Sequence, residues 1–500
     1  MTGSGGLFFV PFIRPAWTAA VMCLALILLA ACDRAPSAES PLRIDAIGSR
    51  AAGAIVAEAL AAGLTARDAH GQIIPGLAQS WRVSDDGLSI VLRLRAAQYS
   101  DGRPILAEDV VSTLEAARKA NNLTADLLAG VTGISAPLGD TIELRLSTPQ
   151  PELLELLATP PLAIRAVRHP DIFAGPYIAL TPAGEKPAHV NLTDLYRNQR
   201  YYAVESVKVA AASVRQAAGR DAVGRFQRGE SDLVSGGRLE GFADARTLGR
   251  RATLLIEQPR ELLLLLVNHQ HEALADLRVR RALSLAIDRE RLGATLFANA
   301  TVPGVYGLTP DSRLPAISSD PLPMRQAEAR ELLAAAGVEL PLRLAVAISQ
   351  SSADADTVSA VAADLAAIGI ELTLVRRSPA GHARAIKEGD FVLALTSHIS
   401  PIDSPLPFLL PFRCDANRFG VCNPEADQLL SDAWVAPGLA ERRAAWEQAE
   451  LLWRDDIAAI GLVRPLAWTL LSPRITGFEV NASGVHRLSM LAVLPERYFR

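Results

Sequence analysis

The stretch that decides the fold runs from Pro75 to Glu115 and reads PGLAQSWRVSDDGLSIVLRLRAAQYSDGRPILAEDVVSTLE. Asp86-Gly87 is a hairpin signal, and SIVLRLR (89–95) after it alternates apolar and polar residues, as a half-buried strand does. Asp101-Gly102 marks a second turn. ILAEDVVSTLEAARKA (105–120) is amphipathic. The segment therefore predicts a strand framed by two turns and followed by a helix.

Strands and helices alternate outward from this segment. The hydrophobic patterns predict strands at 42–47, 141–147, 205–212 and 261–268, with a helix at 278–288. The alternation repeats after residue 320, with Gly337 and Gly369 closing helices, a helix at 440–456 and an apolar, strand-like run at 458–472. Loops are expected at roughly 301–323 and 398–412. The pattern indicates an α/β protein in two lobes.

Composition narrows the class of protein. The 500 residues are 50% hydrophobic and 21% charged, with a formal net charge of −4, which is typical of a folded chain with more than one domain. There is no long basic run, so nucleic acid is not an expected partner. The sequence has no G-x-S-x-G, H-E-x-x-H, P-loop or G-x-G-x-x-G motif in the required context, so no enzyme activity and no cofactor are predicted.

Several segments resemble family 5 extracellular solute-binding proteins, the receptors of peptide and nickel ABC importers. The Pro75–Glu115 stretch carries the family's Pro-Gly-Leu-Ala turn, Trp, two turns and Ala-Glu-Asp-Val helix start in order. GPYIALTPAGE (175–185), RFQRGESDLV, LRVRRALSLAIDRERL (277–292) and RITGFEV also match, so the resemblance covers about 42–500. It implies a type II-like periplasmic-binding-protein fold, with an extra subdomain in the first lobe and a ligand site in the interlobe cleft.

With this resemblance we expect a first lobe at 42–267 with an inserted subdomain at about 71–174, a second lobe at 268–474, and a return to the first lobe at 475–500. The strand that ends at Asn268 is the best candidate for a crossover between the lobes. The expected function is capture of a peptide or peptide-like small solute for ABC permease and ATPase subunits, by a monomer. Alternatives are a receptor-fold sensor or chaperone without a transporter, and an importer receptor for a nickel chelate, a sugar or an opine-like solute.

The N-terminus predicts export. An apolar run from Ala19 to Ala31 is shorter than the about 20 residues that span a membrane, and small residues end it, as in a secretory signal peptide. A transmembrane anchor is the alternative. LAAC, ending at Cys32, resembles the lipobox of bacterial lipoproteins, which implies a signal peptide at 1–31, lipidation of Cys32 and a tether at 32–41. Asp33 favours the periplasmic face of the inner membrane under enteric-type sorting rules.

Two further cysteines, Cys414 and Cys422, lie close together in a chain expected to be exported, where disulfides persist. No His or other Cys flanks them at ligand spacing, so a metal site is not predicted there. The segment also resembles a disulfide loop of dipeptide-binding relatives, which implies the same pairing beside the cleft.

Candidate ligand residues follow from the resemblance. Peptide-binding members carry acidic residues in a stretch that corresponds here to HISPIDSPLPFLLPFRC (398–414), but Pro401 and Ser404 occupy the acidic positions. Asp403 is the only carboxylate left, with a turn-capping role as the alternative. His398 lies where relatives often carry Trp, and is a candidate ligand contact. Arg413, and Arg418 beside it, suit capture of a carboxylate, with a solvated surface role as the alternative.

A His-x-His pair, His269 and His271, follows the strand at 261–268. On an extended strand the two side chains share a face, which gives a weak metal site as one interpretation and a solvent-facing turn as the other. No third ligand is apparent, and no metal is predicted.

Overall fold

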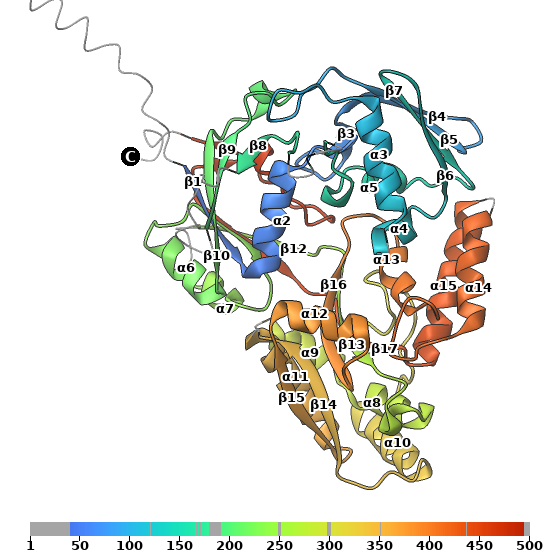
Figure 1. The fold of residues 1–500 in the computed structure, drawn as a ribbon. Helices are drawn as coiled ribbons and strands as arrows, with labels where there is room; N and C mark the ends of the chain where they lie inside the picture. The colour runs from blue at the N-terminus through green and yellow to red at the C-terminus, as the bar shows by residue number, and fades with distance from the viewer. Residues whose placement is uncertain are drawn as a thin grey trace, which may run out of the picture. The chain divides into compact units, whose positions relative to one another are not determined.

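The computed structural model describes residues 41–120, 122–166, 169, 172–179, 192–248, 252–297, 302–350, 352–436 and 438–494. They belong to one compact unit, Pro41–Arg500. Several sheets with helices packed against them confirm the α/β class (Figure 1). In the described part of the chain, no helix is long and apolar enough to cross a membrane.

The largest sheet has seven strands around a parallel centre. β1 pairs in parallel with β10 on one side and with β11 on the other. α2 (Gly48–Leu60) follows β1, α6 (Gly219–Gln227) follows β10, and α7 (Phe242–Arg246) follows β11. The strands, in spatial order, are β12 (Thr253–Glu257), β18 (Ala467–Leu471), β11 (Leu233–Gly237), β1 (Leu42–Ile47), β10 (Ala211–Ala217), β9 (Leu192–Arg197) and β8 (Tyr177–Ala179).

The Pro75–Glu115 stretch contributes two strands to a separate four-stranded antiparallel sheet. Its strands in order are β4 (Ala78–Val83), β5 (Ser89–Leu94), β7 (Thr141–Leu146) and β6 (Val131–Leu138). Gly87, at φ +70°, turns β4 into β5, so the hairpin predicted at Asp86-Gly87 is confirmed. The predicted helix is α3 (Ala107–Arg118), which buries Val110 and Leu114. α4 (Leu123–Leu127) packs against α3, α5 (Leu153–Leu156) packs against β2 (Thr65–Arg67), and β3 (Ile73–Pro75), which pairs with β2, lies against β4.

A third sheet has five strands, with β13 (Glu261–Val267) buried along its whole length. The strand order is β15 (Ile370–Arg377), β14 (Leu342–Ser349), β16 (Leu393–Ile399), β13 and β17 (Ala459–Val463). The associated helices are α8 (Leu277–Ala286), α9 (Arg289–Leu296), α10 (Leu322–Ala335), α11 (Ser352–Ala366) and α12 (Pro379–Glu388). Gly337 and Gly369, both at positive φ, follow α10 and α11 as predicted.

The C-terminal part adds α13 (Leu406–Leu409), α14 (Pro424–Val435) and α15 (Leu439–Asp455). α14 and α15 pack side by side (Figure 1). A short ribbon of β19 (Ile475–Thr476) and β20 (Ala492–Val493) follows.

Two connections carry the chain between the seven-stranded and five-stranded sheets. β12 belongs to the first and β13 to the second, while β17 belongs to the second and β18 to the first. The sheets therefore change at residues 258–260 and 464–466. Arg464 ties these connections together: its Nε donates to the carbonyl of Pro259 (3.1 Å) and its Nη2 to that of Gln258 (3.0 Å).

Two predicted strands need correction. The single run expected at 458–472 is two strands, β17 and β18, in different sheets, because the chain changes sheet around Pro465. The strand expected at 205–212 is wrong over most of its length, since Val204–Ser206 is a 3₁₀ turn and β10 begins at Ala211. Val207 and Val209 alternate like strand residues because both are buried in the core.

Candidate functional site

The candidate site lies where the carboxyl ends of parallel strands in the seven-stranded sheet meet the five-stranded sheet. β1 leads into Arg50 on α2, and β11 leads into Arg238. Gly236 allows the first turn of α2 to approach β11 closely, because a Cβ at Gly236 would lie 2.2 Å from the Cβ of Ala51. In open α/β sheets, ligands bind beyond the carboxyl ends of the parallel strands.

A hydrogen bond from Arg50 links the two sheets. Its Nη1 donates to the carbonyl oxygen of Ser397 on β16 at 3.2 Å. Among the described residues, this is the one hydrogen bond of the Arg50 side chain, and no carboxylate there forms an ion pair with it. We call the group of Arg50, Arg238, Glu261, Ser397 and His398 the junction.

Arg238 and Glu261 make a second link between the sheets. Glu261, at the start of β13, is only 4% exposed. One of its carboxylate oxygens forms an ion pair with Arg238, and the other accepts a hydrogen bond from the hydroxyl of Ser397. The charge of Glu261 is therefore compensated inside the junction, as a buried carboxylate requires.

His398 adjoins Arg50 at the end of β16. Its ring packs against Phe408, with centroids 5.0 Å apart. Burial, and then the positive charge of Arg50, lower the pKa of His398 to about 4, so the imidazole is neutral at pH 7. Within the described residues no hydrogen bond occupies either ring nitrogen.

Asp354 on α11 also senses Arg50. Burial raises the pKa of Asp354 to about 6, against opposing effects of a hydrogen bond from the backbone of Ser349 and of the positive charge of Arg50, while Glu240 raises it further. The pKa of His382 on α12 is lowered, first by burial and in part by Arg377 and Arg50. Arg50 thus acts electrostatically on groups from three elements of the five-stranded sheet and its helices, β16, α11 and α12.

Asp403 lies in a different network. Its side chain is 67% exposed and forms an ion pair with Arg260 at 3.2 Å, and its backbone N–H donates to Glu155 Oε2 at 3.0 Å. Glu155 also pairs with Arg67, which is 3% exposed. In the described part of the chain, no hydrogen bond or ion pair joins Asp403 to His398.

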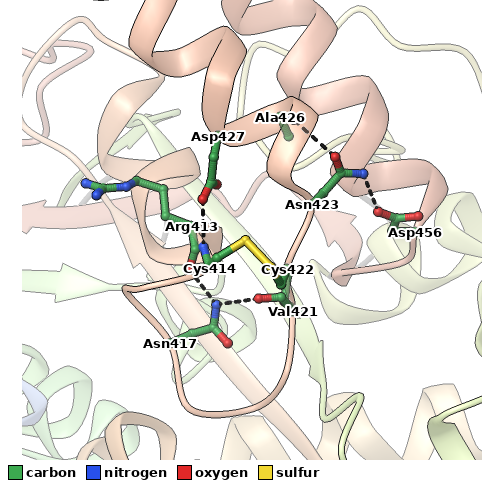
Figure 2. The surroundings of a disulfide bond; sticks show 9 residues. All are labelled: Arg413, Cys414, Asn417, Val421, Cys422, Asn423, Ala426, Asp427 and Asp456. Carbon is green, nitrogen blue, oxygen red and sulfur yellow. Dashed lines mark hydrogen bonds between the residues drawn. A yellow bond between two sulfur atoms is a disulfide. The ribbon is translucent and has the colours of Figure 1, made fainter.

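Cys414 and Cys422 form a disulfide bond (Figure 2). The backbone N–H of Cys414 donates to Asp427 on α14 at 3.1 Å, and Asn417 inside the loop donates to the carbonyls of Arg413 and Val421. These bonds attach the loop to the start of α14, which Asn423 caps.

Arg413 points away from the disulfide in Figure 2. Its Nη2 pairs with Asp415 at 2.7 Å, and its Nη1 lies 4.0 Å from Asp126 on α4. Its guanidinium is thus engaged by two carboxylates, and among the described residues no hydrogen bond or ion pair links it to Asp403 or His398. Their roles in ligand binding, and that of Arg413, stay predictions. Cys32 lies outside the described residues.

His269 and His271 do not lie on an extended strand, because β13 ends at Val267. His269 Nε2 is 3.0 Å from the carbonyl oxygen of Ile457, and burial lowers the pKa of His269 to about 4. The prediction that the two histidine side chains share a strand face, on which the metal interpretation depended, is therefore wrong. No group of three or more metal-ligating side chains occurs among the residues the structure describes.

Two surface hollows lie away from the junction. One, of about 710 Å³, is lined by Ala383, Arg384, Lys387, Glu388 and Arg418. The other, of about 370 Å³, includes Gln98, Ile105, Arg200 and Tyr202. Of the residues singled out in the sequence, only Arg418 lines either hollow.

Sequence reasoning missed Arg50, Arg238 and Glu261. A signal was present, since Gly48-Ser49-Arg50 follows β1, and Gly236-Gly237-Arg238 ends β11 and places Arg238 directly after it, in the same sheet. Had those strands been recognised as parallel neighbours, both arginines would have been placed at one edge.

Comparisons with known proteins agree on one family. The model of "Bacterial extracellular solute-binding proteins, family 5 Middle" matches residues 72–420. The chain is 25% identical over 473 residues to the probable di/tripeptide-binding protein 5 of Pseudomonas aeruginosa, covering 85% of this chain and 88% of that one. It is also 25% identical over 465 residues to the probable deoxycholate-binding periplasmic protein YgiS of Escherichia coli, covering 84% and 85%.

Among solved structures, the murein tripeptide binding protein MppA of Escherichia coli superposes with a TM-score of 0.83 at 19% identity, covering 92% of this chain and 99% of MppA. This likeness establishes the periplasmic-binding-protein fold expected from the sequence. The family is one of solute-binding proteins and not of enzymes. Because the matched segment makes up more than half of its length, the chain belongs to the bacterial extracellular solute-binding proteins of family 5.

Proposed function

We propose that this chain is the lipid-anchored substrate-binding component of an ABC importer, which captures a peptide or peptide-like small solute and delivers it to a permease. The di/tripeptide-binding relative supports the ligand class, at 25% identity over most of both chains. In this proposal the receptor is a monomer with two lobes that close on the solute. One lobe is built largely around the seven-stranded sheet and the other around the five-stranded sheet.

The observation that carries this proposal is the junction. Arg50 and Arg238 come from the seven-stranded side, whereas Glu261, Ser397 and His398 come from the five-stranded sheet. A solute bound among these groups contacts both sides at once, so its binding energy is available to hold the two sides together.

The anchor is part of the same proposal. Lipidation at Cys32 and a tether to residue 41 hold the receptor near its permease, at the inner membrane if Asp33 acts as a retention signal. Cys32→Ser is expected to move the exported protein from the membrane fraction to the periplasmic extract. Retention of the variant in the membrane would instead indicate that the apolar segment before it is a true anchor.

The ligand class is tested by thermal unfolding with tri-alanine, a mixed tripeptide pool and deoxycholate, each at several concentrations. A ligand that binds only the folded state adds about 2.7 kcal/mol to the free energy of unfolding at 100 times its Kd, which raises Tm measurably. We expect concentration-dependent stabilisation by peptides. If neither tri-alanine nor the peptide pool shifts Tm while deoxycholate does, the peptide assignment is wrong.

A further inference from the structure

Arg442 on α15 is a charged residue buried at a long-range contact. It is 3% exposed, and its Nη2 donates to the carbonyl oxygen of Pro149 at 2.5 Å, across 293 positions of sequence. Its guanidinium also lies 5.9 Å from the ring centre of Trp446 on the same helix. Pro149 follows β7 of the four-stranded sheet, whereas α15 leads into β17 of the five-stranded sheet. The bond therefore joins these two parts of the molecule.

The charge of Arg442 is only partly compensated at this contact. Burial raises the pKa of the nearby Glu152, and the positive charge of Arg442 acts in the opposite direction. Among the described residues, however, no ion pair joins Arg442 to Glu152. The Nε of Arg442 and the Oε1 of Glu152 are buried, and no described group forms a hydrogen bond with either atom. Separation of the two surfaces would hydrate both charges, so the contact holds the parts together and can still be released.

Two further polar contacts join the same parts. The backbone N–H of Asp403 donates to Glu155 on α5 at 3.0 Å, and Arg413 lies 4.0 Å from Asp126 on α4. α4 also packs against α13, and buried apolar side chains from both parts belong to one continuous hydrophobic cluster. Of the polar contacts, only the one at Arg442 is made by a cation that is almost fully buried.

We infer that Arg442, through its bond to Pro149, is a positioning residue that stabilises the closed arrangement of the two lobes. In the lobe division expected from the sequence, Pro149 belongs to the first lobe and Arg442 to the second, so separation of the lobes breaks the bond. We call Arg442, Pro149 and Glu152 the clasp. The inference rests on the proposed function, since it concerns the same closure, and it adds residues outside the junction that set how much of the free receptor is closed.

The first test measures the separation of the two parts without a solute. Spin labels are attached after Leu138→Cys on β6 and Val435→Cys on α14, two positions that are 65% and 70% exposed. Their distance distribution is measured by double electron–electron resonance, with wild-type Arg442, with Arg442→Gln and with Arg442→Met. We expect both variants to raise the ratio of longer to shorter distances about 10-fold, which is the effect of losing one hydrogen bond made by a charged group.

The neighbouring arginine supplies a matched control. Arg443 lies on the same helix and is exposed, and no described group forms a hydrogen bond or ion pair with its side chain. Arg443→Gln should leave the distance distribution unchanged. Circular dichroism confirms that each variant is folded. Arg442→Met keeps an apolar chain of similar length in the buried position, so it decides the result if Arg442→Gln fails to fold.

The second test follows the solute. The dissociation constant of tri-alanine is measured by titration calorimetry for the same variants without spin labels. Because the apparent affinity falls with the fraction of receptor that can close, we expect Arg442→Gln and Arg442→Met to weaken binding by up to about 10-fold, and Arg443→Gln to leave it unchanged.

The two results separate the inference from the proposed function. If the Arg442 variants lengthen the distances but no peptide binds to wild type, the peptide assignment fails and the clasp stands. If the Arg442 variants give the same distance distribution as Arg443→Gln, the clasp is wrong whatever the solute is, even where the variants are less stable than wild type.

Discussion

Glu58 offers a quantitative test of the electrostatics of α2, the helix that carries Arg50. Burial raises the pKa of Glu58 to about 7, even though the positive charges of Arg487 and Arg67 act in the opposite direction. The ordinary value is 4.5. The perturbation is Glu58→Gln, which keeps the size of the side chain and makes it permanently uncharged.

The sign follows from the direction of the shift. Because the folded-state pKa of Glu58 lies above the unfolded-state value, the folded state retains the proton between about pH 4.5 and 7. The contribution of Glu58 to stability is therefore undiminished below pH 4.5, falls as pH rises from about 4.5 to about 7, and is constant above that. Each pH unit between the two values corresponds to about 1.4 kcal/mol, so ionised Glu58 destabilises the fold by about 3 kcal/mol at pH 8.

The assay is urea unfolding followed by tryptophan fluorescence at pH 4, 6 and 8. We expect Glu58→Gln to match wild type at pH 4 and to exceed it by about 3 kcal/mol in free energy of unfolding at pH 8. Glu447→Gln, at an exposed position on α15, is the control and should show no such pH dependence. A Glu58→Gln variant that is less stable than wild type at pH 8, or that differs from it equally at every pH, would refute the reasoning.

Three further predictions concern stability and are measured by urea unfolding at pH 7. Replacing both Cys414 and Cys422 by Ser should lower the free energy of unfolding by about 2–3 kcal/mol, because the closed loop then becomes free in the unfolded chain; reductant should lower wild type equally, and an unchanged midpoint would count against the disulfide. Arg464→Leu should cost about 2 kcal/mol through its lost bonds to the Pro259 and Gln258 carbonyls, whereas Asp311→Asn should cost under about 1 kcal/mol because Asp311 is 65% exposed; equal effects would contradict this. Arg289→Met should cost about 3 kcal/mol, because the buried carbonyls of Gly461, Val305 and Ser284 lose their donor; a neutral effect would show that other groups replace it.

The elements that the sequence predicted correctly are those that depend on residues close together in the chain. The β4–β5 hairpin and α3 depend on a turn at Asp86-Gly87 and on hydrophobic periodicity within a few residues. The error at 458–472 has the opposite origin. β17 and β18 are both apolar and nearly continuous in sequence, and only their pairing partners, β13 and β11, reveal that they lie in different sheets.

The candidate site depends even more on contacts between residues that are far apart in the sequence. Arg50 and Ser397 meet across 347 positions of sequence, so no local pattern brings them together. Asp403 is selected by likeness to a family motif, and Arg413 by the fit of a guanidinium to a carboxylate. Their ion-pair partners from distant parts of the chain, Arg260 and Asp126, are set by tertiary packing. His398 is selected by likeness to the family, as Asp403 is, and its place beside Arg50 became visible only with the structure.

The central claim is that a solute is bound where the two sheets meet. Hydrogen–deuterium exchange with and without saturating tripeptide tests this most directly, because it reports on both sides of the junction in one experiment. We predict slower exchange in the first turns of α2 and also at Leu393–Ile399 on β16. Protection confined to one of the two segments, or found only at the hollow beside Arg384 and Lys387, would contradict the account.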